Sequence, residues 1–106
     1  MSGSASLAHL VIRNGEFAGT TYVLDKQETI IGRNPTTNIT LLDEGISREH
    51  SIILRDEDEG LYTIEDLQST NGTKVNGKRI RTAELAHGDE IQIGRTLFEF
   101  LAGEPE

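Results

Sequence analysis

The sequence contains no cysteine and no tryptophan, and only two of its 106 residues are proline. Without cysteine the chain cannot be stapled by disulfides, and the composition does not indicate a redox compartment, so a cytoplasmic location is the default expectation. No run of apolar residues approaches the roughly 20 that a membrane-spanning helix requires. Residues 1–6 lack the basic start and the apolar stretch of a secretion signal, and we expect them to be a disordered tail or a cloning scar.

Positive charge is also scarce: the chain has 10 Lys and Arg residues and 18 Asp and Glu residues, which gives a net charge of −8. This balance argues against general binding of nucleic acid or of membranes, since both need a positive face. Six basic residues nevertheless fall in or beside three polar loops: Arg33, Arg48, Lys74, Lys78, Arg79 and Arg81. A small basic focus on an acidic body favours one discrete anionic ligand. For Lys78, Arg79 and Arg81, ordinary solvated surface stays an equal alternative.

Helical periodicity is missing, since no window of 11 or more residues keeps a helical repeat. Short β-branched and aromatic runs instead recur at intervals of roughly 8–12 residues, separated by turns rich in glycine. This pattern predicts an all-β domain, either a sandwich or a barrel. The expected strands cover residues 7–13, 20–24, 28–33, 39–42, 49–55, 61–66, 73–75, 78–80, 90–93 and 96–101.

Polar dipeptides mark the turns between these strands. Asn14–Gly15, Asn71–Gly72 and Asn76–Gly77 are each expected in a tight turn, because Asn and Gly accept positive φ angles. The domain is expected to span residues 7–101, and residues 102–106 are expected to begin a linker.

Three loops concentrate polar side chains of a similar kind. The first carries Gly32 and Arg33 at the end of an expected strand, and the second carries Ser47-Arg48-Glu49-His50 directly before another. The third is Ser69-Thr70-Asn71-Gly72. Side chains at such junctions are held by a rigid framework and are well placed for recognition. Guanidinium, hydroxyl and amide groups recur here without a thiol or an obvious general base, which indicates a site that holds an anion.

The chemistry of these groups matches a phosphorylated peptide. A phosphothreonine carries about −1.5 to −2 charges near neutral pH and three strong acceptor oxygens. The planar fork of Arg33 suits bidentate contact with phosphate, and Ser47 and Thr70 supply neutral donors. Asn71 offers both a donor and an acceptor, as recognition of a peptide backbone requires. None of these groups needs to gain or lose a proton, which is typical of a binding site.

Six segments follow one another in a fixed order: Gly32–Arg33, Ser47–His50, Ser69–Thr73, Val75–Gly77, Gly88–Ile91 and Ile93–Gly94. Together they closely resemble the pattern of the forkhead-associated (FHA) domain. Each segment alone is a weak signal, whereas all of them at this spacing are highly specific. The resemblance runs from about Leu7 to Leu101, and no core motif position departs from the family pattern.

The resemblance implies a sandwich of two mostly antiparallel sheets with about eleven short strands, whose loops at one end bind phosphothreonine in an extended peptide. It places Arg33, Ser47 and Thr70 at the phosphate. It gives Arg48 a part in holding the phosphate or the peptide backbone, and it gives Asn71 a hydrogen bond to the peptide backbone beside the phosphothreonine.

The same resemblance gives Gly32, His50 and Gly72 architectural parts in presenting the other side chains. His50 heads an apolar strand and is expected to be a hydrogen-bonded core residue. FHA domains often select the residue about three positions after the phosphothreonine through variable loops, here near Gly45–Ile46 and Gly94–Arg95. The preference stays open, because Ile46 favours an apolar residue there and Arg95 an acidic one.

Each candidate side chain also has an ordinary structural explanation. Asn71 precedes a glycine and could serve only the turn. Arg33 could form a surface ion pair with Asp43 or Glu44, and the two hydroxyl side chains could cap a loop or end a strand. No spacing of His, Asp and Glu residues indicates a metal site, and no cofactor is expected.

Three other functions compete with phosphopeptide binding. An enzyme would use Ser47 as nucleophile and His50 as base, but a nucleophile elbow and a partner acid are lacking. The two side chains would also face opposite ways if a strand began at or before Ser47. A phosphate-independent interaction module on the same sandwich is the main alternative, against which the intact loop residues argue. Nucleic-acid binding is disfavoured, because a basic stripe with stacking aromatics is absent.

The expected partner is a threonine-phosphorylated protein or peptide, bound in trans and prepared by an upstream Ser/Thr kinase. Nucleic acid and membranes are not expected partners. The chain ends in Glu104-Pro105-Glu106, which is typical of a linker and predicts that the domain belongs to a longer multidomain signalling protein.

Overall fold

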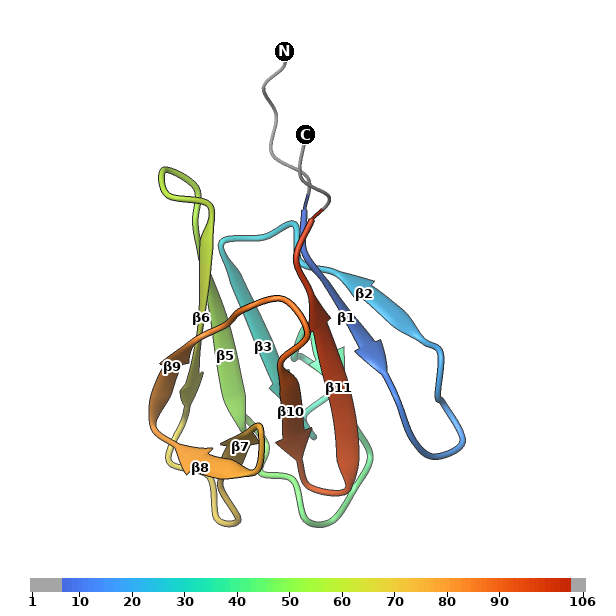
Figure 1. Cartoon of the computed structure of the whole chain (residues 1–106). Helices are drawn as coiled ribbons and strands as arrows, with labels where there is room; N and C mark the ends of the chain where they lie inside the picture. The colour runs from blue at the N-terminus through green and yellow to red at the C-terminus, as the bar shows by residue number, and fades with distance from the viewer. Residues whose placement is uncertain (1–6, 104–106) are drawn as a thin grey trace.

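The structure, a computed structural model, describes residues 7–103, which form two β-sheets stacked on each other (Figure 1). The tail expected at residues 1–6 and the last three residues of the expected linker lie outside the described residues. Among the residues described there is no helix, and therefore none long and apolar enough to span a membrane. The prediction of a mostly antiparallel all-β sandwich is confirmed.

Eleven short strands build the sandwich. They are β1 (His9–Ile12), β2 (Thr21–Val23), β3 (Glu28–Gly32), β4 (Ile39–Thr40), β5 (Ser51–Asp56), β6 (Leu61–Asp66), β7 (Thr73–Val75), β8 (Lys78–Ile80), β9 (Thr82–Glu84), β10 (Glu90–Ile93) and β11 (Thr96–Leu101).

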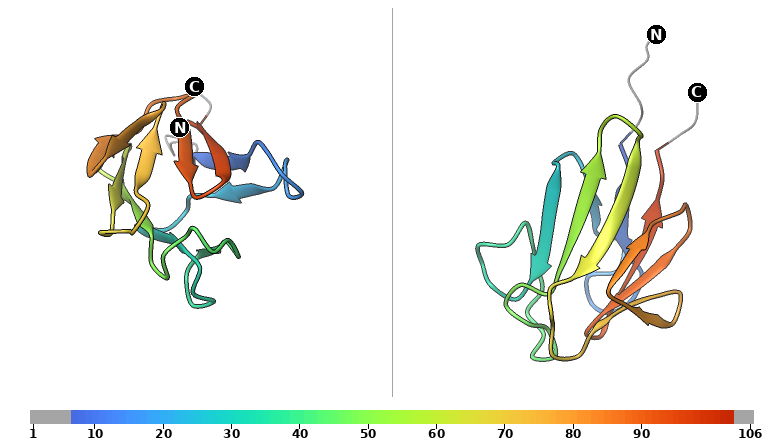
Figure 2. Two further views of the ribbon diagram at one scale, coloured as in Figure 1. Left: turned by 90° about the horizontal axis from the view of Figure 1, so that it is seen from below. Right: turned by 90° about the vertical axis from the view of Figure 1, so that its left-hand side faces the viewer.

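The strands divide between a sheet of six, in the order β2-β1-β11-β10-β7-β8, and a sheet of five, in the order β4-β3-β5-β6-β9. The right-hand view of Figure 2 shows β3, β5 and β6 of the five-stranded sheet side by side. All described pairings are antiparallel except that of β3 with β4. The chain passes repeatedly between the sheets, so loops from both sheets gather at the same end.

Five strands have the predicted bounds, namely β6, β7, β8, β10 and β11, and five others differ by one or two residues at one or both ends. β9 was not expected. Only one of its three residues, Thr82, is β-branched, and Ala83 is too small to give an apolar signal. β9 forms because it pairs with the edge of β6, where Ala83 lies opposite Ile64. A contact of this kind cannot be inferred from three residues.

The core lies between the sheets and follows the alternation of the strands. Phe98 and Phe100 of β11 are buried, and so are Ile91 and Ile93 of the neighbouring β10. From the other sheet Ile64 of β6 is fully buried as well. Each fully buried side chain of this size stabilises the fold by about 1.5–3 kcal/mol through the area it removes from water.

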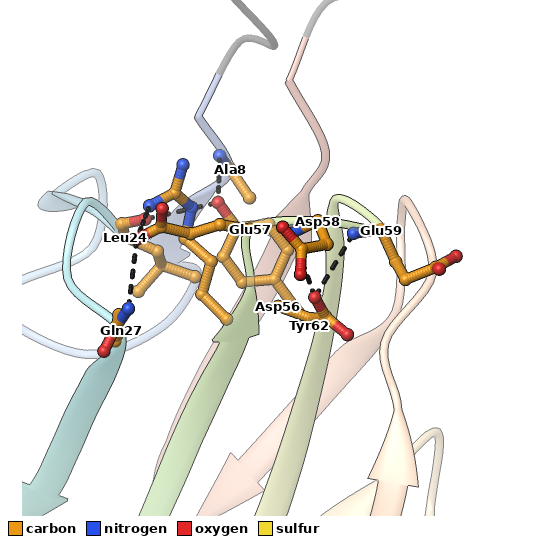
Figure 3. Close-up of polar contacts among 9 residues, drawn as sticks. Ala8, Leu24, Gln27, Asp56, Glu57, Asp58, Glu59 and Tyr62 are labelled. Atoms are coloured by element: carbon orange, nitrogen blue, oxygen red, sulfur yellow. Dashed lines mark hydrogen bonds and ion pairs between the residues drawn. The ribbon is translucent and has the colours of Figure 1, made fainter.

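A tyrosine joins the two sheets at the end of the sandwich where β1 begins (Figure 3). The Tyr62 hydroxyl accepts a hydrogen bond from the Ala8 N–H at 3.2 Å and donates one to the Leu24 carbonyl oxygen at 3.2 Å. Its ring packs edge-to-face on Phe100 with 5.5 Å between centroids. Tyr62 thus connects the five-stranded sheet to the start of β1 and the end of β2. This junction lies where β1 begins and β11 ends, at the end of the sandwich opposite the polar loops (Figure 1).

We expect Tyr62→Phe to destabilise the domain by about 1–3 kcal/mol, because the buried Ala8 N–H and Leu24 carbonyl both lose their partner. Urea unfolding measures the change. The control is Tyr22→Phe, since the Tyr22 hydroxyl has no hydrogen bond within residues 7–103 and its ring is only half-buried. Equal stability of the two variants would contradict the assigned contribution of the Tyr62 hydroxyl.

Candidate functional site

The loops predicted to carry the site come together at the end of the sandwich that faces the viewer in the left-hand view of Figure 2. They are the β3–β4 loop (residues 33–38), the β4–β5 loop (residues 41–50) and the β6–β7 loop (residues 67–72). β3 ends, β5 begins and β6 ends at this edge of one sheet, which explains why loops distant in sequence become neighbours.

Gly32 lets the first two loops pass in contact with each other. The Arg33 N–H donates to the Ser47 carbonyl at 3.0 Å, and the Asn34 N–H donates to the Arg48 carbonyl at 3.1 Å. A Cβ atom on Gly32 would collide with that same Arg48 carbonyl oxygen. Only glycine fits here, because any side chain would push the β4–β5 loop off the end of β3.

Arg33 is exposed, yet one part of its guanidinium is held in place. Its Nε–H donates to the Ile46 carbonyl at 2.9 Å. Within residues 7–103 its two terminal nitrogens have no hydrogen-bond or ion-pair partner, and the alternative ion pair with Asp43 or Glu44 is not formed. Arg48 is exposed as well, and its side chain likewise has no partner among the described residues. The loop end therefore carries two cationic groups open to a ligand.

Ser47 connects the second loop to the third. Its hydroxyl oxygen accepts the Thr70 N–H at 3.1 Å, so the hydroxyl proton is left to donate elsewhere. The Thr70 hydroxyl is exposed at the same place. Two hydroxyl donors thus lie on neighbouring loops, and the hydrogen bond from the Thr70 amide to the Ser47 hydroxyl joins those loops.

Asn71 reaches across to the β4–β5 loop, where its side-chain N–H donates to the Gly45 carbonyl at 2.9 Å. The explanation of Asn71 as a positive-φ turn residue is wrong, because that conformation belongs to Gly72, with φ 87°. A Cβ on Gly72 would collide with Arg79, whose side chain lies over this glycine. The tight turn expected at Asn76–Gly77 is confirmed by φ angles of 53° and 84°.

His50 is fully buried and is bonded through both ring nitrogens. Nδ1 accepts the Ser47 N–H at 3.1 Å, and Nε2 lies 2.8 Å from the Gly72 carbonyl oxygen. Since an amide can only donate to Nδ1, the ring proton is on Nε2 and is donated to Gly72. A single neutral imidazole therefore holds the β4–β5 and β6–β7 loops at a set separation.

A carboxylate that the sequence did not indicate organises the β6–β7 loop. Asp66 accepts the Ser69 N–H at 3.0 Å, the Ser69 hydroxyl at 2.5 Å and the Thr73 hydroxyl at 2.7 Å. Because the Thr73 proton goes to Asp66, the Ser51 hydroxyl must donate to Thr73 at 2.7 Å. Burial alone would raise the pKa of Asp66, but the Ser69 and Thr73 hydrogen bonds outweigh it and lower the pKa below its ordinary value.

Asp43 plays a comparable part in the β4–β5 loop and was also missed as an organising residue. It accepts the Gly45 N–H at 2.8 Å and the Arg95 N–H at 2.9 Å, and these bonds lower the pKa of its carboxyl. Local spacing could have indicated both carboxylates, because Asp with a partner two or three residues later is the pattern of an Asx turn or a cap. The link from Asp43 to Arg95 spans 52 residues and has no local signal.

Comparison with known proteins decides the family. The FHA domain family model matches residues 29–94, which is more than half of the chain. The chain belongs to the FHA domain family. A solved FHA domain from a structural and functional analysis of phosphothreonine-dependent FHA domain interactions superposes with a TM-score of 0.85 and 33% identity, over 94% of this chain and 100% of that chain.

Two bacterial regulators are similar in sequence. The oxoglutarate dehydrogenase inhibitor of Corynebacterium jeikeium is 40% identical over 99 residues, which are 93% of this chain and 67% of that protein. The glycogen accumulation regulator GarA of Mycobacterium tuberculosis is 40% identical over 96 residues, which are 91% of this chain and 58% of that protein. This FHA chain thus spans less than two thirds of the GarA relative. The comparisons give no support to a longer multidomain chain, which stays a prediction.

We expect Asp66→Asn to lower the stability of the domain by about 1–3 kcal/mol at neutral pH, since three hydrogen bonds to a charged acceptor are weakened. The control Asp58→Asn, on an exposed side chain without a described hydrogen bond, should have little effect.

The pH dependence of this difference follows from the lowered pKa. The folded-state pKa of Asp66 lies below 3.8, so its contribution is fully present above that pH and is lost as the pH falls through the folded-state value. Unfolding free energies measured at a series of pH values should show a constant gap between the native chain and Asp66→Asn at neutral pH, and a narrowing gap below pH 3.8. A gap that widens in acid would contradict this assignment.

Proposed function

We propose that this FHA domain is a signalling module that recruits a threonine-phosphorylated protein by binding its phosphopeptide in the three loops. One observation carries the proposal: Arg33 is anchored through Nε while its terminal nitrogens stay without a partner in residues 7–103. A guanidinium held in this way is preorganised for bidentate contact with a phosphate. Ser47, Thr70 and Arg48 would complete the phosphate contacts, and Asn71 would hold the peptide backbone.

The site residues remain part of this proposal, with Gly32, His50 and Gly72 as its structural support. The family and the phosphothreonine-dependent interactions of a similar FHA domain favour it. Binding in trans, an upstream Ser/Thr kinase and a cytoplasmic location belong to the same proposal, as do the domain limits of residues 7–101.

An enzymatic role is not part of the proposal. The relatives are named an inhibitor and a regulator. β5 begins at Ser51, so the earlier expectation that a strand turns Ser47 and His50 to opposite faces has no basis. The hydrogen bonds give a better reason, because His50 Nδ1 accepts the Ser47 amide and Nε2 donates to Gly72. Neither ring nitrogen is left to take a proton from the Ser47 hydroxyl.

Removing the anchored guanidinium should weaken binding strongly. We expect Arg33→Ala to cost roughly 2–4 kcal/mol of phosphopeptide affinity, the usual loss for a charged hydrogen-bonding partner. The peptide is the most enriched member of an oriented phosphothreonine library, and calorimetric titration measures its affinity. Arg55→Ala is the control, because Arg55 pairs with Glu57 and lies opposite Tyr62 in the β5–β6 ladder, away from the three loops. Unchanged affinity of Arg33→Ala would remove Arg33 from the site.

Peptides that differ only at the modified residue should rank in a set order. Phosphothreonine should bind best, and phosphoserine about 1–2 kcal/mol more weakly if the missing methyl lies in a packed pocket. Glu and unmodified Thr should not bind measurably, because a single planar carboxylate leaves donors arranged for a tetrahedral group unsatisfied. Equal affinity for the phosphorylated and unmodified peptides would favour the alternative, a phosphate-independent interaction module on the same sandwich.

A further inference from the structure

A groove lined mainly by apolar side chains lies beside the candidate site, between the β1–β2 loop and the β4–β5 loop. It has a volume of about 280 Å³, and its lining includes Ile12, Phe17, Tyr22, Leu41, Leu42 and Asp43. Small-molecule sites usually start at about 300 Å³. A groove of this size suits one or two apolar side chains of a polypeptide better than a complete small molecule. We call it the Phe17–Leu42 groove.

Two side chains of this groove are exposed in a way that the fold does not require. Phe17 is 67% exposed and Leu42 is 87% exposed. The β1–β2 loop is shaped by Thr20, whose N–H and hydroxyl donate to the Phe17 carbonyl at 3.1 and 2.7 Å. The Phe17 ring takes no part in that turn. Large apolar side chains left in water next to a hollow are typical of a surface that meets a partner.

Both walls of the groove are fastened to the same strand connection. The Asn14 side chain donates to the Arg95 carbonyl at 2.8 Å and accepts the Leu97 N–H at 2.9 Å, which fixes the β1–β2 loop. From the other wall Asp43 accepts the Arg95 N–H at 2.9 Å. A Cβ on Gly94 would meet Ile46 and the Asp43 carboxylate, so the connection packs closely against the β4–β5 loop. The groove is therefore a formed surface and needs no loop closure.

The groove adjoins the candidate phosphopeptide site, and Asp43 lies between the two. Asp43 lines the groove, and its Oδ1 accepts the Gly45 N–H. The Gly45 carbonyl oxygen in turn accepts a hydrogen bond from the Asn71 side chain. A peptide held at Asn71 would therefore be separated from the groove only by the β4–β5 loop. In Figure 1 the β1–β2 and β10–β11 loops lie at the same end of the sandwich as the polar loops.

We propose that the Phe17–Leu42 groove is a second docking site for the same phosphorylated partner, and that it binds an aliphatic or aromatic side chain outside the segment held by the three loops. The proposal rests on the proposed function, because the phosphate anchors the partner and the groove adds a second contact on the same chain. Once the phosphothreonine is bound, the rest of the partner is held at a high effective concentration near the groove. Even a weak apolar contact there raises the affinity of the domain for that partner and restricts which partners bind well.

The test compares a short and a long phosphopeptide with the same residues around the phosphothreonine, taken from an oriented library. The long peptides carry Ser/Gly extensions on both sides, and a single Phe is moved through the extensions one position at a time. The protein variants are Phe17→Ser, Leu42→Ser and their combination. Val23→Ser and Leu61→Ser are matched controls, since these side chains are 49% and 41% exposed and lie outside the groove.

At one or a few Phe positions the native chain should bind the long peptide about tenfold more tightly than the short one, and the double variant should lose this gain while it binds the short peptide normally. Equal affinity for all long peptides, or equal effects of the control variants, would overturn the groove proposal alone. No binding of the short peptide would overturn the proposed function and the groove with it. If analytical ultracentrifugation showed that the native chain dimerises and the double variant does not, with the same peptide affinity for both, the groove would bind a second copy of the chain. That result would also overturn the proposal.

Discussion

A single buried imidazole sets the geometry on which the binding end of this FHA domain depends. His50 accepts the Ser47 amide on one side and donates to the Gly72 carbonyl on the other, so two loops separated by more than 20 residues are joined through one ring. A protonated ring would present a donor to the Ser47 N–H and could not make both bonds. The neutral form is therefore built into the arrangement, and the ring is fully buried where water cannot replace either partner.

The surrounding contacts add rigidity to that junction. Gly32 brings the first loop against the second, and Asp66 gathers the hydroxyls of Ser69 and Thr73 beneath the third. The donors offered to a ligand are then in position before binding, which lowers the ordering cost of recognition. At the far end of the sandwich, Tyr62 fastens the sheets to each other. The Tyr62 contacts that join the sheets and the loops that offer donors to a ligand thus lie at opposite ends of the sandwich.

The parts that the sequence predicts well are those with a local signal. Strands such as Leu61–Asp66 and Thr96–Leu101 carry a β-branched and aromatic pattern, and Asn76–Gly77 matches a tight turn. The candidate loops could be named because polar types cluster in them and because the whole set resembles one family.

What escaped prediction depends on contacts between distant residues. Tyr62 bonds to Ala8 across 54 residues, and Asn14 bonds to Arg95 across 81, so neither is marked in its own neighbourhood. The strand Thr82–Glu84 exists only through its pairing with β6. The groove between Phe17 and Leu42 forms from two loops that only the sandwich brings together.

Recognition of the phosphate group by the three joined loops is open to direct observation. The most direct measurement is an NMR titration of the ¹⁵N-labelled chain with a phosphothreonine peptide and with its unmodified counterpart. We expect the largest chemical-shift changes at the Arg33 side-chain Nε–H, the Thr70 amide and the Asn71 side chain, and only with the phosphorylated peptide. Equal changes with the unmodified peptide, or changes concentrated on the outer face of either sheet, would contradict this expectation.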